Sequence, residues 1–72
     1  MTESQNKQIA RHLKDGKRIT SLEALRLYGC LRLSGRIHDL RRDGLNIETR
    51  MIDTLTGKRI AEYYIRRPND NN

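Results

Sequence analysis

The spacing of apolar residues in this chain changes once, near Asn46, and that change limits which folds are open to it. Before Asn46 the aliphatic residues recur three or four positions apart, which is typical of helices that pack by one face. After Asn46 the pattern changes to a period of two, which indicates two strands. Ile47, Thr49 and Met51 alternate with Glu48, Arg50 and Ile52, and later Ala61, Tyr63 and Ile65 alternate with Ile60, Glu62 and Tyr64. Because a chain of 72 residues can build only one small core, we expect a single α+β domain.

The first helix is expected over residues 5–14. Ile9 and Leu13 lie one helical turn apart in this segment, so both should face the core. A side chain with an oxygen just before the helix would satisfy one of its free backbone amides. The candidates for this cap are Thr2 and Ser4.

The second helix is expected to start at Thr20 and to run to about Tyr28. Thr20 and Glu23 are spaced as in a capping box, in which each side chain satisfies one free backbone amide. Gly29 follows the last helical residue and should end the helix. We expect Leu22 and Leu25 to form the buried side of this helix, with Tyr28 as a further candidate.

The third helix is expected from about Leu33 to Asp43, where Gly44 ends it. Leu33, Ile37 and Leu40 form its apolar stripe, so only one narrow face should be buried. Since successive residues turn by about 100°, the other side of the helix carries polar, cationic or small residues. These residues are Gly35, His38, Asp39 and Arg42 on the far side, and Arg32, Ser34, Arg36 and Arg41 on the flanks.

The two strands are separated by residues 53–58, which contain a turn signal at Thr56-Gly57, so the pair should form an antiparallel hairpin. Arg18 and Ile19 could add a third strand. The resulting order of helix, short strand, helix, helix, strand, strand is that of a winged helix-turn-helix domain. We place this domain at residues 5–67, with flexible termini at 1–4 and 68–72.

The charge of the chain indicates a polyanionic partner. Lys and Arg together number 15 against 9 Asp and Glu, which gives a formal net charge of +6. Arginines outnumber lysines, and the guanidinium group donates in a fixed fork that suits phosphates and guanine edges. The alternative is that these charges serve only to solvate the surface.

Double-stranded DNA is the polyanion that the third helix fits best, because a helix anchored by one face can present the other to the major groove. Arg36 and Arg42 are expected to bind guanine edges or clamp phosphates. Arg32 and Ser34 are expected to contact phosphates at the positive end of the helix. Gly35 should allow the backbone to approach DNA closely, and Arg41 is a further candidate contact.

The remaining candidate contacts each have a second interpretation. Asp39 either accepts a hydrogen bond from a cytosine amine or pairs with Arg36 or Arg42, and we favour the pair. His38 either touches a base or is an exposed bystander. The hairpin tip either lies along the minor groove as a wing or is an ordinary polar turn. Its candidate contacts are Thr56, Lys58 and Arg59, and Arg66 and Arg67 could add a last phosphate contact or keep the edge strand soluble.

Two motifs in the chain resemble those of small helix-turn-helix proteins encoded by bacteriophages and prophages. They are IT-S-x-EAL-x-x-x-G over residues 19–29 and L-S-x-RI-x-DLR-x-x-G over residues 33–44, within a likeness that covers roughly residues 7–65. The resemblance implies a winged helix DNA-binding module with a role in transcription regulation, and Ser34 to Arg42 as its recognition helix. One departure is that Gly29 follows Ala24 by five positions where four are common, so we expect a longer turn.

The sequence offers no support for an enzyme or for a cofactor, because it lacks a Gly-rich phosphate loop, a metal-spaced Cys and His cluster, and a nucleophile beside a base. We therefore expect no small-molecule substrate. His12 and His38 fall on different helices and are both expected at the surface. Cys30 is the one cysteine, which fits a reducing cytoplasm, and we interpret it as a small buried residue in preference to a redox switch. No apolar run is long enough for a membrane span or a signal peptide.

Other partners remain open. A protein–protein module could use the same basic helix to bind an acidic surface on a host protein. RNA is less favoured, because the aromatic residues are three tyrosines without Phe or Trp. Since one domain covers only a DNA half-site, tight binding would call for a homodimer, tandem copies or an accessory protein. Tyr63 or Tyr64 could serve such a contact, although packing on the core is the favoured role.

Overall fold

The computed structural model describes residues 4–66. The helices are α1 (Gln5–Lys14), α2 (Ser21–Tyr28) and α3 (Leu33–Arg42), and the strands are β1 (Ile19–Thr20), β2 (Ile47–Asp53) and β3 (Arg59–Ile65). This order confirms the predicted α+β winged helix-turn-helix fold. Arg67 and the predicted terminal segments, Ser4 excepted, lie outside the described residues.

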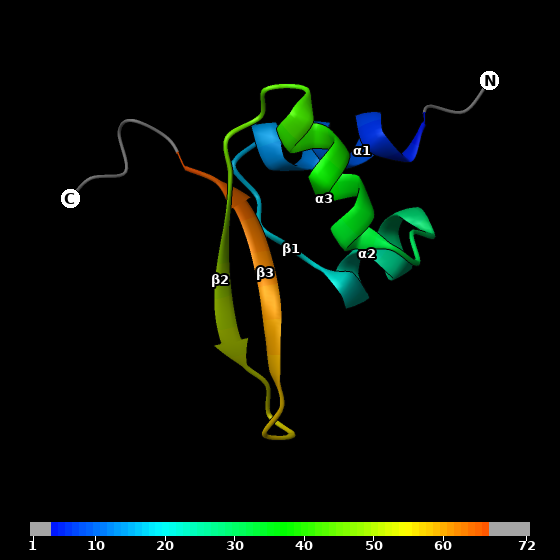
Figure 1. Ribbon diagram of the computed structural model, residues 1–72. Helices are drawn as coiled ribbons and strands as arrows, with labels where there is room; N and C mark the ends of the chain where they lie inside the picture. The colour runs from blue at the N-terminus through cyan, green and yellow to red at the C-terminus, as the bar shows by residue number, and fades with distance from the viewer. Residues whose placement is uncertain (1–3, 67–72) are drawn as a thin grey trace.

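The sheet is antiparallel, with β3 between β1 and β2. Tyr63 lies opposite Ile19 on one side and opposite Thr49 on the other. The predicted third strand therefore forms, although it covers Ile19–Thr20 and begins one residue later than expected. Figure 1 shows the helices gathered beside one end of the sheet, while the hairpin of β2 and β3 projects away from them, with its turn at the far end.

The core draws on every helix and on the sheet. Ile9 and Leu13 of α1 are fully buried, as their spacing predicted. Cys30, between α2 and α3, is only 2% exposed, which confirms its role as a small buried residue. The other buried apolar residues are Ile19, Ala24, Leu33, Ile37, Leu40 and Ile47, with Tyr63 and Ile65 packed against them.

The helix ends follow the predicted capping chemistry. Ser4 caps α1, because its hydroxyl accepts a hydrogen bond from the backbone amide of Lys7 at 3.3 Å. The capping box of α2 is complete: the Glu23 amide donates to Thr20 Oγ1, and the Thr20 amide donates to Glu23 Oε1. Gly29 ends α2 with φ 66°, a left-handed conformation that glycine adopts without steric cost.

The predicted buried side of α2 is wrong. Leu22 is 60% exposed and Leu25 is 44% exposed, whereas Ala24 is fully buried. This helix has only eight residues, and it packs by its smallest apolar side chain, which lets its backbone come close to the core. Tyr28 is half-buried and does pack against the core, so only that part of the prediction is confirmed.

The predicted surface position of His12 is also wrong. Its side chain is only 9% exposed and lies between three elements of the fold. Its Nε2 lies 2.9 Å from the Arg18 carbonyl oxygen, and its Nδ1 lies 2.8 Å from the Tyr28 hydroxyl. Because a carbonyl only accepts, Nε2 donates to it, and in the neutral ring Nδ1 accepts from the hydroxyl. His12 thereby links α1 to α2 and to the segment before β1.

Candidate nucleic-acid interface

The third helix is held to the body by one face. Leu33 and Ile37 are each 1% exposed and Leu40 is 4% exposed, so the stripe seen in the sequence is the buried face. Within residues 4–66, no side chain caps the start of α3, where Arg32 occupies the cap position. The start of α3 thus relies on no side-chain cap among these residues, and helix starts of this kind often bind a phosphate.

The opposite face of α3 is open to solvent. Ser34, Gly35, His38 and Arg42 are exposed, and Arg36 and Asp39 are half-buried. A shallow hollow of about 300 Å³ on this face brings five of the candidate residues together. Its lining residues are Arg32, Gly35, Arg36, His38 and Asp39.

Asp39 pairs with Arg36. The distance between Asp39 Oδ2 and Arg36 Nη1 is 3.9 Å, and both side chains are about two-fifths exposed. This is the pairing that we favoured over a base contact for Asp39. The ion pair is long and solvated, so it holds the guanidinium loosely and leaves its other N–H groups free to donate.

Gly35 lies within a helix, unlike the other glycines of the described chain. A Cβ atom placed on Gly35 would have no heavy atom within 4 Å, so the position is open space. Packing inside the protein therefore does not require glycine here. A bulkier side chain at this point would stand between the α3 backbone and any molecule lying along the helix.

Arg41 is occupied within the fold. Its Nε donates to the Ile47 carbonyl at 3.1 Å, and its Nη2 donates to Thr49 Oγ1 at 2.9 Å. Arg41 thus ties the end of α3 to β2 and differs from the other cationic residues of the helix. The sequence groups it with them because a helical wheel cannot show where the next strand lies.

The wing is an ordered turn. The Thr54 amide donates to the Lys58 carbonyl at 2.8 Å, and the Lys58 amide donates to Thr54 Oγ1 at 3.2 Å. Thr56 Oγ1 lies 2.9 Å from Thr54 Oγ1. Arg59 pairs with Asp53 at 3.4 Å, with both side chains largely exposed. These contacts order the turn that carries the candidate wing residues, and Lys58 and Arg59 are exposed to solvent.

The two neighbouring tyrosines point to opposite faces of the sheet. Tyr63 packs against the core, as favoured. The same prediction is wrong for Tyr64, which lies on the other face beside Arg18. Arg66 is exposed just after β3 and lines a hollow with Tyr64, apart from the candidate contacts of α3 and the wing. Arg67 lies outside the described residues.

Sequence reasoning missed an apolar groove between α2 and the wing. Leu31 is 83% exposed and Leu55 is fully exposed, and both line this groove with Leu22, Leu25 and Ile60. The spacing of Leu22 and Leu25 suggests core packing, so the sequence does not reveal the groove.

Among residues 4–66, no helix has the length and apolar character that crossing a bilayer requires. Within the same residues, no group of three His, Cys, Asp or Glu side chains is placed to hold a metal ion.

Comparison with known proteins agrees with this arrangement. The family model described as a winged helix-turn-helix domain matches residues 4–68, which is nearly the whole chain. Neither a search among curated proteins nor one among solved structures gives a match.

Proposed function

The chain belongs to the winged helix-turn-helix domain family, a membership that indicates DNA binding, and from this premise we propose that it binds a specific sequence in double-stranded DNA. In this proposal α3 enters the major groove and the wing lies near the minor groove. The protein then acts as a small regulator of transcription, or as an accessory factor that shapes DNA, of the kind that bacteriophages and prophages encode.

One observation carries the proposal: α3 is buried along Leu33, Ile37 and Leu40 and is open along the side that bears Arg36 and Arg42. A recognition helix needs this division, because the anchored face fixes its position while the other face donates to base edges and phosphates. The half-buried Arg36 lies beside Asp39, whereas Arg42 is exposed in the last turn. Each can donate two parallel hydrogen bonds to a guanine.

The first experiment identifies the target. Selection from random duplex DNA gives the bound sequence, and a mobility shift then measures the affinity of Arg36→Ala and Arg42→Ala for it. We expect each substitution to cost about 1–3 kcal/mol of specific binding. Arg26→Ala is the control, since Arg26 is exposed on α2 outside the proposed interface. If both α3 variants fold and bind like the unmodified protein, α3 is not the recognition helix.

The number of protein copies bound to one duplex can be measured on the same protein–DNA complex. One domain of this size covers a half-site, so we expect a homodimer or an accessory protein at the full site. The rival function is a protein–protein module in which the same basic helix contacts an acidic partner. Displacement by duplex competitor and a linear fall of log affinity with log salt identify DNA as the partner.

A further inference from the structure

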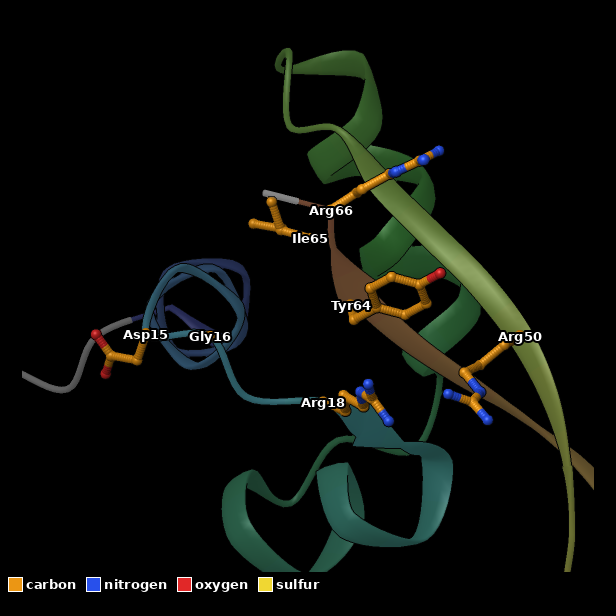
Figure 2. A pocket seen from close by; sticks show the side chains of 7 residues that line it. All are labelled: Asp15, Gly16, Arg18, Arg50, Tyr64, Ile65 and Arg66. Carbon is orange, nitrogen blue, oxygen red and sulfur yellow. The ribbon is translucent and has the colours of Figure 1, made fainter. Parts of the chain in front are cut away.

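A second group of arginines lies on the face of the sheet that is turned away from the core. Side chains alternate between the two faces of a strand, and Tyr63 packs against the core, so Tyr64 lies on the opposite face. A hollow of about 730 Å³ on this side is far larger than one phosphate ion. Figure 2 shows Arg18, Arg50 and Arg66 around Tyr64, with α3 behind the sheet. Asp15, Gly16 and Ile65 complete the lining.

Two of these arginines lie within ion-pair distance of the same carboxylate. Glu62 Oε1 lies 3.8 Å from Arg18 Nη1 and 3.9 Å from Arg50 Nε, and the Glu62 side chain is only 16% exposed. The Arg18 guanidinium also lies 5.6 Å from the centre of the Tyr64 ring, a cation–π contact. Each guanidinium carries five N–H groups, so these contacts leave donors of Arg18 and Arg50 available.

Arg66 supplies the third guanidinium. It is exposed, and among residues 4–66 no hydrogen bond or ion pair engages its side chain. Asp15 and Glu48 also lie on this side, since Glu48 is opposite Tyr64 in the register. With Glu62, the acidic residues balance the arginines in formal charge. The surface is therefore suited to direct hydrogen-bond donation at short range, and its balanced charge attracts a polyanion from a distance less than α3 does.

We propose that Arg18, Arg50 and Arg66 form a second phosphate-binding surface that holds the backbone of a second duplex segment, so that one domain bridges two segments. The inference rests on the proposed function for the first segment, which α3 holds. Arginine forks suit phosphate oxygens, and contacts made to phosphates alone carry no direct sequence preference.

A bridging assay tests this inference. A duplex of about 20 base pairs, roughly two helical turns, is fixed to beads, and a fluorescent copy of the same duplex is added with the protein. The fluorescence retained on the beads measures bridging. A mobility shift with one duplex measures simple binding separately, so failure of the proposed function and failure of this inference give different results.

The variant is Arg50→Gln combined with Arg66→Gln. It keeps Arg18 beside Glu62, so the half-buried carboxylate retains a cationic partner and the fold is preserved; thermal unfolding checks this. Lys7→Gln combined with Arg26→Gln is the matched control, because it removes the same charge from exposed positions of α1 and α2. A third protein, Arg36→Ala with Arg42→Ala, removes the proposed first site.

The expected result is that the Arg50 and Arg66 variant binds one duplex within about threefold of the unmodified protein yet bridges at least about tenfold less. The matched control should bridge normally, and the Arg36 and Arg42 variant should not bridge. Inorganic phosphate added at constant ionic strength should leave bridging intact.

Three results would overturn the inference. In the first, the unmodified protein binds one duplex but never bridges. In the second, the Arg50 and Arg66 variant bridges as well as the unmodified protein, which would assign bridging to dimerisation. In the third, low concentrations of inorganic phosphate abolish bridging, which would reassign the hollow to a free anion. Absence of any binding to one duplex would instead contradict the proposed function, and this inference with it.

Discussion

At the scale of single residues, Gly35 is a position where the fold does not require glycine but the proposed interface does. The four other glycines have positive φ angles, at residues 16, 29, 44 and 57, and serve as turns or helix ends. Gly35 has no such angle and no neighbour within 4 Å of an added Cβ. Within a helix it lowers stability relative to alanine, so a reason for glycine must lie outside the packing of the chain.

Substitution of this glycine gives the first prediction. Gly35→Ala should raise the free energy of unfolding by about 0.5–1 kcal/mol, measured by denaturant titration. The same variant should bind the selected duplex more weakly, because the added methyl group stands where the α3 backbone approaches DNA. A variant that is both more stable and equally tight in binding would show that Gly35 does not face the duplex.

His12 gives the second prediction. His12→Ala should lower the free energy of unfolding by about 2 kcal/mol, since it removes the hydrogen bonds to Tyr28 and Arg18 and leaves a gap among α1, α2 and the segment before β1. His38→Ala is the control. Its exposed site on α3 should make it neutral to within about 0.5 kcal/mol. Equal stability of the two variants would mean that the His12 contacts do not hold the helices together.

The contrast between the two histidines shows where sequence reasoning reaches its limit at this scale. Both are helical and neither has a carboxylate motif nearby, so the sequence predicts both at the surface. His12 is buried because Tyr28 and the Arg18 carbonyl meet above it, and this meeting depends on how α1 crosses α2. The buried stripe of α3 was predictable because its three aliphatic residues leave only one possible face.

At the scale of elements, the type and limits of each helix and strand were largely predictable, while the orientation of α2 was not. The capping box and Gly29 mark the ends of α2 through local chemistry. The choice of its buried face is decided by neighbours: Ala24 fits against the core and Leu22 and Leu25 face the groove beside the wing. In this helix of eight residues the exposed leucines outnumber the one buried alanine, so the sequence suggests the wrong buried face.

The wing gives the third prediction. Lys58→Ala combined with Arg59→Ala should weaken binding to all duplex sequences alike. It should also flatten the slope of log affinity against log salt by about 0.9 for each phosphate that the variant no longer neutralises. Stability should change little, since the Arg59–Asp53 pair is exposed. The measurement is a binding titration at several salt concentrations, with Lys7→Ala and Arg26→Ala as control, and an unchanged slope would remove the wing from the interface.

At the scale of the whole molecule, the order of elements was predictable because the change in apolar spacing near Asn46 divides helices from strands. The placement of candidate residues was only partly predictable. The structure brings Arg32, Gly35, Arg36, His38 and Asp39 around one hollow, while Arg41 is tied to β2. That tie, and the arginine group on the far face of the sheet, depend on strand register, which apolar alternation does not fix across distant segments.

The most direct test of the central claim is an NMR titration of isotope-labelled protein with one equivalent of the selected duplex. The account predicts that the largest changes in amide shift fall on Ser34, Gly35, His38 and Arg42, followed by the wing residues 54–59. Changes confined to α1, or to the apolar groove between α2 and the wing, would contradict it, because DNA would then bind elsewhere than on the exposed face of α3.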